Sequence, residues 1–108
     1  MADEKIFSDD VNAARKRWVE VLKIQTVWAK GTVVPGCNPA IWRTDTYGSL
    51  MNRSEYGNCE SAFGWEIDHI QPLSLNGSER FANLQPLSWK NNRAKADKVI
   101  STTGILGI

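Results

Sequence analysis

The stretch that most constrains the fold is residues 65–98, in which two short β-type segments precede a helical one. Trp65–Ile70 has the aromatic and β-branched content of a short strand, and Pro72 stops it. A polar loop centred on Asn76-Gly77 leads to a second short apolar stretch at Leu84–Leu87. This order predicts two strands joined by a loop, with a helix after the second strand.

The predicted helix begins after Ser88, which is a good N-cap residue. Residues 90–99 contain helix formers such as alanine, lysine and arginine. The final stretch, residues 101–108, contains two glycines and has no clear period, so we expect an irregular tail there.

Polar residues fall at informative places in this strand, loop, strand and helix unit: Glu66, Asp68, His69, Asn83 and Asn92. His69 is the chain's one histidine. A lone histidine usually has no catalytic role, but this one follows an aspartate on a short strand. Neighbouring strand residues point to opposite faces, so Asp68 and His69 can serve one site only where the strand ends or twists.

A helix that packs across the strand pair would bring Asn92 beside Asp68. Two hard oxygen ligands are typical of a Mg²⁺ site that keeps several waters. A phosphate could take the remaining coordination positions, with His69 on its other side. Neutral imidazole is a competent base near neutral pH, so the pattern suggests hydrolysis of a phosphodiester.

The motif made by these segments resembles that of the HNH endonucleases. The matching pieces are Gly64-Trp65-Glu66-Ile67-Asp68-His69-Ile70-Gln71-Pro72, Asn76-Gly77, Asn83-Leu84-Gln85-Pro86-Leu87 and Asn91-Asn92-Arg93-Ala94-Lys95-Ala96-Asp97. The stretches Ile41-Trp42-Arg43 and Arg53-Ser54-Glu55-Tyr56-Gly57-Asn58 are also similar to small bacterial and phage-type HNH proteins. The resemblance implies a ββα-metal unit.

The same resemblance implies a role for each motif residue: Asp68 and Asn92 as metal ligands, His69 as general base, and Asn83 as the residue that ties the loop and orients the base. Asn92 stands where the family name has its last histidine, which makes this an H-N-N variant and favours Mg²⁺ or Mn²⁺. Asn91 is the alternative ligand. Glu66 is a possible supporting residue, although a solvated carboxylate is an equal interpretation.

No structural zinc is expected, because Cys37 and Cys59 are far apart in sequence and belong to no CxxC pair. Two reduced thiols are the favoured interpretation, and a single disulfide is the alternative. The five tryptophans are therefore expected to contribute mostly to the core.

In the amino-terminal half, apolar residues recur at helical spacing over residues 10–30, which predicts a helix there. Asp9 or Asp10 is the expected cap of this helix. An irregular connection follows, and residues 41–53 predict a β-hairpin in which Gly48 takes a positive φ. With 108 residues, the chain is expected to form one domain of the α+β class, with this helix and hairpin beside the ββα unit.

The charge distribution favours a phosphate backbone at the carboxy-terminal end. Net charge is only +1, but four acids lie within residues 1–10, and Asp97 is the only acid from Arg80 onward. The candidate phosphate contacts are Arg93, Lys95, Arg43 and Arg53. The expected partner is duplex DNA, bound by a monomer or a weak dimer.

The sequence has no long apolar run and no secretory pattern. We therefore expect a cytoplasmic location and no membrane role.

These features predict a metal-dependent DNA endonuclease that nicks one strand with low sequence specificity. The alternative from another class is a catalytically inactive DNA-binding or accessory module of a larger phage or restriction complex.

Overall fold

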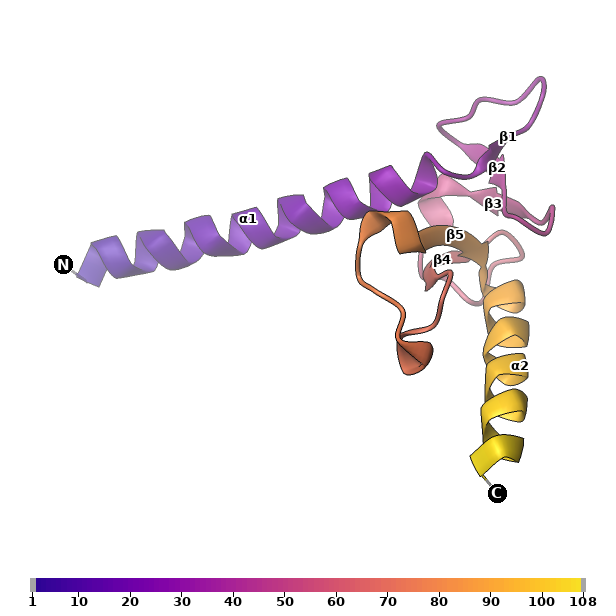
Figure 1. Cartoon of the computed structure of the whole chain (residues 1–108). Coiled ribbons are helices and arrows are strands. Elements are labelled where there is room, and N and C mark those ends of the chain that lie inside the picture. The colour runs from indigo at the N-terminus through magenta and orange to yellow at the C-terminus, as the bar shows by residue number, and fades with distance from the viewer. Residues whose placement is uncertain (1, 108) are drawn as a thin grey trace.

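The computed structural model describes the backbone of residues 2–107 and the side chains of residues 10–99. Two helices flank two small antiparallel sheets, which confirms the predicted α+β class (Figure 1). The helices are α1 (Ala2–Trp28) and α2 (Trp89–Gly107). The strands are β1 (Thr32–Val33), β2 (Trp42–Thr44), β3 (Leu50–Asn52), β4 (Trp65–His69) and β5 (Leu84–Ser88).

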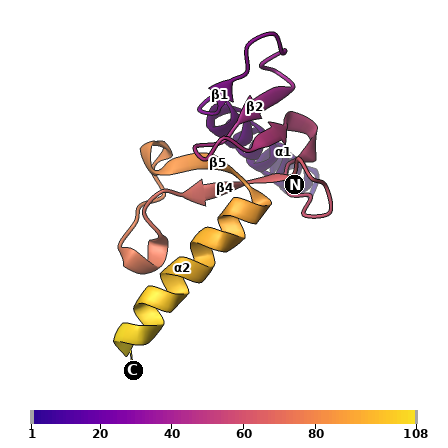
Figure 2. The ribbon, with the colours of Figure 1, turned by 90° about the vertical axis from the view of Figure 1, so that its right-hand side faces the viewer.

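The carboxy-terminal part forms the strand, loop, strand and helix unit that the sequence predicts. β4 and β5 pair antiparallel over their full lengths, from Trp65 opposite Ser88 to His69 opposite Leu84. α2 leaves the end of β5 and runs across the strand pair (Figure 2). Pro86 is tolerated in β5 although it has no N–H to donate. β5 is an edge strand that pairs only with β4 in this two-stranded sheet.

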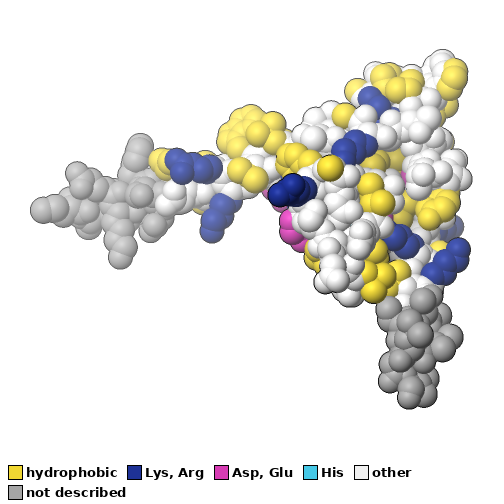
Figure 3. All heavy atoms as spheres, viewed as in Figure 1, with side chains coloured by type: hydrophobic (Ala, Val, Ile, Leu, Met, Phe, Trp, Pro, Cys, Tyr) yellow, Lys and Arg dark blue, Asp and Glu magenta, His cyan; other side chains and the backbone are white. Residues whose placement is uncertain are grey.

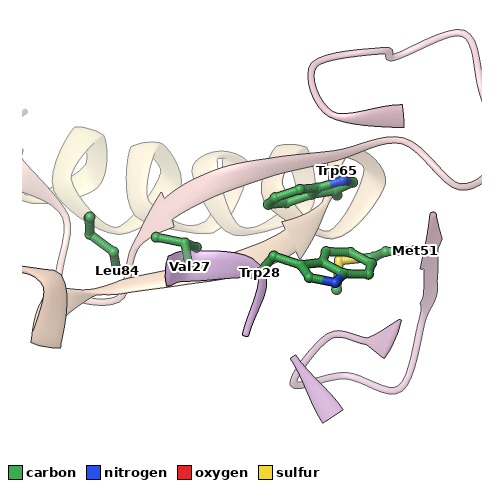
Figure 4. Packing of buried hydrophobic residues seen from close by; sticks show 5 residues of the cluster. All are labelled: Val27, Trp28, Met51, Trp65 and Leu84. Atoms are coloured by element: carbon green, nitrogen blue, oxygen red, sulfur yellow. The ribbon is translucent and has the colours of Figure 1, made fainter. Parts of the chain in front are cut away.

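The core lies where the last turn of α1 meets both sheets (Figure 4). Trp28 packs against Trp65 with ring centroids 5.1 Å apart, and both side chains are fully buried. Their indole N–H groups donate to the main-chain carbonyls of Pro39 and Arg53 respectively, so each ring is buried without an unpaired donor. Val27, Met51 and Leu84 complete the cluster.

α1 begins at Ala2 and ends at Trp28, whereas the sequence predicted residues 10–30. Residues 2–9 include neither proline nor glycine, and acids near the start favour a helix through its dipole, so Asp9 and Asp10 lie inside the helix and do not cap it. α1 projects from the body (Figure 1). No helix in the described part of the chain is long and apolar enough to cross a membrane.

The projecting part of α1 leaves several apolar side chains uncovered (Figure 3). Trp18 is 66% exposed, so the expectation that the tryptophans are mostly core fails at this position. The sequence pattern around it is typical of a helix with a covered face, but the part of α1 that packs against the core is its end, where Ile24, Val27 and Trp28 lie.

The predicted hairpin is present as β2 and β3, and Gly48 in its turn has φ +85°. The structure adds β1, which pairs with β2 and makes a three-stranded sheet. Two residues carry too little pattern to predict a strand, and β1 is defined by its partner. The expected irregular tail is instead helical to Gly107, since Gly104 lowers helix propensity without ending the helix.

Candidate active site

A cavity of about 370 Å³ opens between the end of β4, the loop after it and one face of α2. Its walls include four of the polar residues that the sequence singled out: Asp68, His69, Asn92 and Lys95. β4 ends at His69, and the end of the strand allows neighbouring residues to reach one cavity despite their opposite strand parity. The rest of the wall is mostly apolar and is formed by Ile67, Pro72, Leu73, Ser74, Ala96 and Val99.

Asp68 is the buried carboxylate of this cavity, with only 8% of the residue exposed. Its Oδ2 accepts a hydrogen bond from Gln85 Nε2 at 2.9 Å, across the β4–β5 ladder, and another from Lys95 Nζ at 2.6 Å. An ionised carboxylate is costly to bury unless it is paired and hydrogen-bonded, and both conditions hold here. Gln85 was not among the predicted site residues, and its place opposite Asp68 follows from the strand register.

His69 contacts Glu79 of the loop, with Nε2 3.1 Å from Oε2. A carboxylate accepts hydrogen bonds and an imidazole nitrogen donates only when it is protonated, so the contact assigns the proton to Nε2. The lone pair of the neutral ring then lies on Nδ1. Glu79 was not among the predicted site residues. It lies ten residues after His69, and only the folded conformation of the polar loop brings the two side chains together.

Asn83 fastens the loop between β4 and β5. Its Oδ1 accepts from the Gln71 N–H at 2.9 Å, and its Nδ2 donates to the carbonyls of Gln71 and Ser78 at 3.1 and 2.7 Å. The backbone of Asn83 also accepts from the Ile70 N–H at 2.7 Å. These bonds hold the segment that follows His69, which is the arrangement a loop-tying residue requires.

Asn92 lies on α2 with its side chain at the cavity, and Nδ2 donates to Glu66 Oε1 at 3.3 Å. That donor direction leaves Oδ1 as the group that can act as a ligand. Glu66 and Asp68 share one face of β4, so Glu66 orients the amide from the same strand that carries the carboxylate.

Asn91 has a different place. Its Nδ2 donates to Asp45 Oδ2 and to Ser49 Oγ, both at 2.8 Å, and its N–H donates to the N-cap Ser88 Oγ at 3.2 Å. These contacts join α2 to the turn between β2 and β3. Consecutive helix residues point about 100° apart, which separates Asn91 in this joint from Asn92 in the cavity.

Asp45 is the acceptor at the centre of that joint, and it is 3% exposed. Burial alone would raise the pKa of its carboxyl. Hydrogen bonds from the Asn91 side chain and from the N–H groups of Ser88, Ser49 and Tyr47 outweigh burial and hold the pKa below the usual 3.8. The carboxylate thus ties the hairpin to the start of α2.

The two cysteines form no disulfide with each other. Cys37 and Cys59 are free, exposed thiols.

The predicted phosphate contacts are scattered in the structure. Lys95 turns into the cavity, and Arg93 lies over the Trp89 ring with its guanidinium carbon 5.6 Å from the centroid. Arg43 donates to the carbonyls of Pro39, Ala29 and Gly31, and Arg53 donates to Gln25 Oε1. The structure therefore gives Arg43 and Arg53 internal contacts and does not gather the four cations beside the cavity.

The donor chemistry of the cavity fits a single hard divalent cation. Asp68 and Asn92 supply two oxygen donors, and a positive group already occupies Asp68 Oδ2 in the form of the Lys95 ammonium. Among the described residues, no group of three or more His, Cys, Asp or Glu side chains is placed to hold a metal. A cation here would thus depend on water and substrate for most of its coordination.

Comparison with known protein families finds a match for this part of the chain. Residues 57–98, which run from before β4 into α2, match the family model described as HNH endonuclease. No curated protein and no solved structure gave a match. The family match covers every residue that lines the cavity except Val99, and it leaves α1 and the first sheet outside.

Proposed function

We propose that this chain is a divalent-metal-dependent endonuclease that hydrolyses phosphodiester bonds in DNA, because residues 57–98 match the family model described as HNH endonuclease. The observation that carries the proposal is the convergence of Asp68, His69 and Asn92 on one cavity within the family segment. A phosphate at the mouth of this cavity would lie between the imidazole and the two oxygen donors.

His69 is the proposed general base. With Nε2 held by Glu79, Nδ1 carries the lone pair that removes a proton from the attacking water. The carboxylate of Glu79 fixes the ring and stabilises the imidazolium that forms when the proton is taken. The water oxygen bonds to phosphorus and the bond to the leaving 3′ oxygen breaks. Solvent water protonates that oxygen, and the ring releases its own proton to solvent.

Asp68 and Asn92 would hold the cation, with Mg²⁺ or Mn²⁺ favoured by their oxygen donors. When bound, the ion supplies Lewis-acid stabilisation of charge on the phosphate oxygens. Glu66 positions the Asn92 amide, and Gln85 positions the Asp68 carboxylate. Asn83 acts through the loop, by keeping the backbone after His69 in place.

The proposed nicking rests on the single cavity of this kind among the described residues, because one base and one cation act on one strand in each binding event. Low sequence specificity follows from the few groups available to read bases, since Arg43 and Arg53 are used inside the protein. Duplex DNA is the proposed partner through its backbone, with the chain acting as a monomer or a weak dimer.

The test is a supercoiled-plasmid assay with the full chain across a metal series that includes Mg²⁺, Mn²⁺ and chelator alone. We expect open-circle product with Mg²⁺ or Mn²⁺, none with chelator, and at least about 10²-fold slower product formation from His69→Ala. Asp97→Ala, an exposed change on α2, is the matched control and should cut as the parent does.

The alternative, a module that binds DNA without cutting, makes the opposite prediction in the same assay. Retention of the plasmid in a gel-shift experiment, with no metal-dependent product from the folded parent chain, would favour that alternative and reject the enzyme. Loss of cutting in His69→Ala with retained gel shift would favour the enzyme.

A further inference from the structure

Lys95 makes three close contacts at the end of β4. Its Nζ donates to Asp68 Oδ2 at 2.6 Å, to the His69 carbonyl at 2.6 Å and to the Ile70 carbonyl at 3.0 Å. An ammonium has three N–H donors, so these acceptors account for all of them. The Lys95 side chain is 18% exposed and that of Asp68 is 9% exposed, so this ion pair is largely removed from water.

The position differs from that of an ordinary lysine on a helix surface. Lys98, one turn further along α2, is exposed, whereas Lys95 lines the cavity with Asp68 and Asn92. The ammonium therefore neutralises the carboxylate that is the proposed metal ligand, and two backbone carbonyls hold it there whichever side chain stands at position 68.

We propose that Lys95 is a built-in counter-cation that competes with the divalent ion for Asp68 and so lowers the affinity of the site for metal. The inference rests on the proposed function, since it takes Asp68 as a ligand. The positive charge of the Lys95 ammonium repels a divalent ion bound to the same carboxylate, and so disfavours binding of that ion. This repulsion is stronger where water is excluded. In the metal-free protein the same ammonium stabilises the buried carboxylate.

The pairing has opposite consequences for metal affinity and for metal-free stability. Removing the ammonium leaves Asp68 buried with one hydrogen bond from Gln85, which destabilises the metal-free fold. The same removal frees Oδ2 for the dication and eliminates the repulsion. A lysine that merely positioned Asp68 for the metal would instead weaken metal binding when removed.

The experiment is a Mn²⁺ titration of the full chain, in which free Mn²⁺ is followed by electron paramagnetic resonance without DNA. We expect Lys95→Met to bind Mn²⁺ about tenfold or more tightly than the parent. Lys98→Met removes the same charge from an exposed site on the same helix, and should change the affinity by less than about threefold.

Thermal unfolding supplies the second readout. We expect Lys95→Met to unfold at a lower temperature than the parent without metal and to regain the difference with saturating Mn²⁺. Lys95→Gln, which keeps a hydrogen-bond donor and is less disruptive, should show the same tighter Mn²⁺ binding, so the inference can be tested even if the methionine variant does not fold.

The failure of this inference can be told from that of the proposed metal site by Asp68→Asn. If Asp68→Asn abolishes Mn²⁺ binding while Lys95→Gln binds the ion no more tightly than the parent, the counter-cation inference is wrong and the metal site stands. If Asp68→Asn binds Mn²⁺ as tightly as the parent does, or if the parent, Asp68→Asn and Lys95→Gln all fail to bind it, both proposals are overturned.

Discussion

The carboxylate oxygen Oδ2 of Asp45 lies 2.8 Å from the side-chain nitrogen of Asn91, and this contact joins the β2–β3 turn to the first turn of α2. The same oxygen accepts the Ser88 N–H at 3.0 Å, where β5 ends and α2 begins. Asn92 and Lys95 both project from α2 into the cavity, so the joint fixes the helix that carries them. A polar contact outside the cavity thereby sets the geometry inside it.

Asp45→Ala should destabilise the fold by about 3 kcal/mol, because it leaves buried N–H donors without an acceptor. Urea unfolding at neutral pH measures the change. Asp97→Ala, at an exposed site on α2, is the control and is expected to alter the free energy of unfolding by less than about 0.5 kcal/mol. Equal stability of the two variants would show that the joint is not needed.

Acid should weaken the protein partly through the same residue. The pKa of Asp45 lies below 3.8 in the fold, so as pH falls the unfolded chain takes up the proton first. The stabilisation is present above the unfolded pKa of about 3.9 and is lost as pH falls through the lower folded value. Urea titrations between about pH 2.5 and 5 should show a shallower pH dependence for Asp45→Asn. An unchanged slope would contradict this assignment.

His69→Ala should lower plasmid nicking by about 10²- to 10⁴-fold, since it removes the proposed base. Mn²⁺ binding should persist, because Asp68 and Asn92 are untouched. Parallel measurements of nicking rate and Mn²⁺ affinity check this separation. A variant that loses the ion together with the activity would place His69 among the ligands.

Glu79→Gln should reduce the nicking rate less than His69→Ala does, by about tenfold, because the amide can still contact Nε2 but no longer carries the charge that stabilises the imidazolium. The rate constant for cutting at saturating metal is the quantity to compare. Glu60→Gln, an exposed glutamate before β4, is the matched control. A Glu79→Gln enzyme as fast as the parent would remove Glu79 from the mechanism.

Asn83→Ala should loosen the loop and slow nicking while leaving the core folded. The side chain holds Gln71 and Ser78, so hydrogen exchange should accelerate at the amides of residues 71–83 more than in α2. Amide exchange followed by mass spectrometry makes the comparison. Uniform acceleration throughout the chain would indicate global destabilisation instead.

The order of β4, β5 and α2 could be predicted from the sequence because local composition determines each piece, and Ser88 is confirmed as the N-cap of α2. The place of Asp68, His69 and Asn92 on one cavity was reached from strand parity, the strand end and the motif. These are short-range properties that a single sequence carries.

Long-range contacts could not be predicted in this way. Glu79 reaches His69 only through the folded loop, and Lys95, expected at a phosphate, turns instead to Asp68. Arg43 had the appearance of a surface cation, but three main-chain carbonyls surround its guanidinium. The partners lie in loops or on a strand that packs against the residue, and their identity depends on chain packing that residue spacing does not specify.

Because only the end of α1 packs against the core, the chain should tolerate shortening from its amino end up to a definite residue and lose its fold beyond it. Residues 11–22 project beyond the body and include the exposed Trp18, whereas Val27 and Trp28 fill the interior beside Trp65. Trimming that stops before Ile24 would leave the unit of β4, β5 and α2 intact, and removal of one further turn would leave a cavity where Val27 packs in the core.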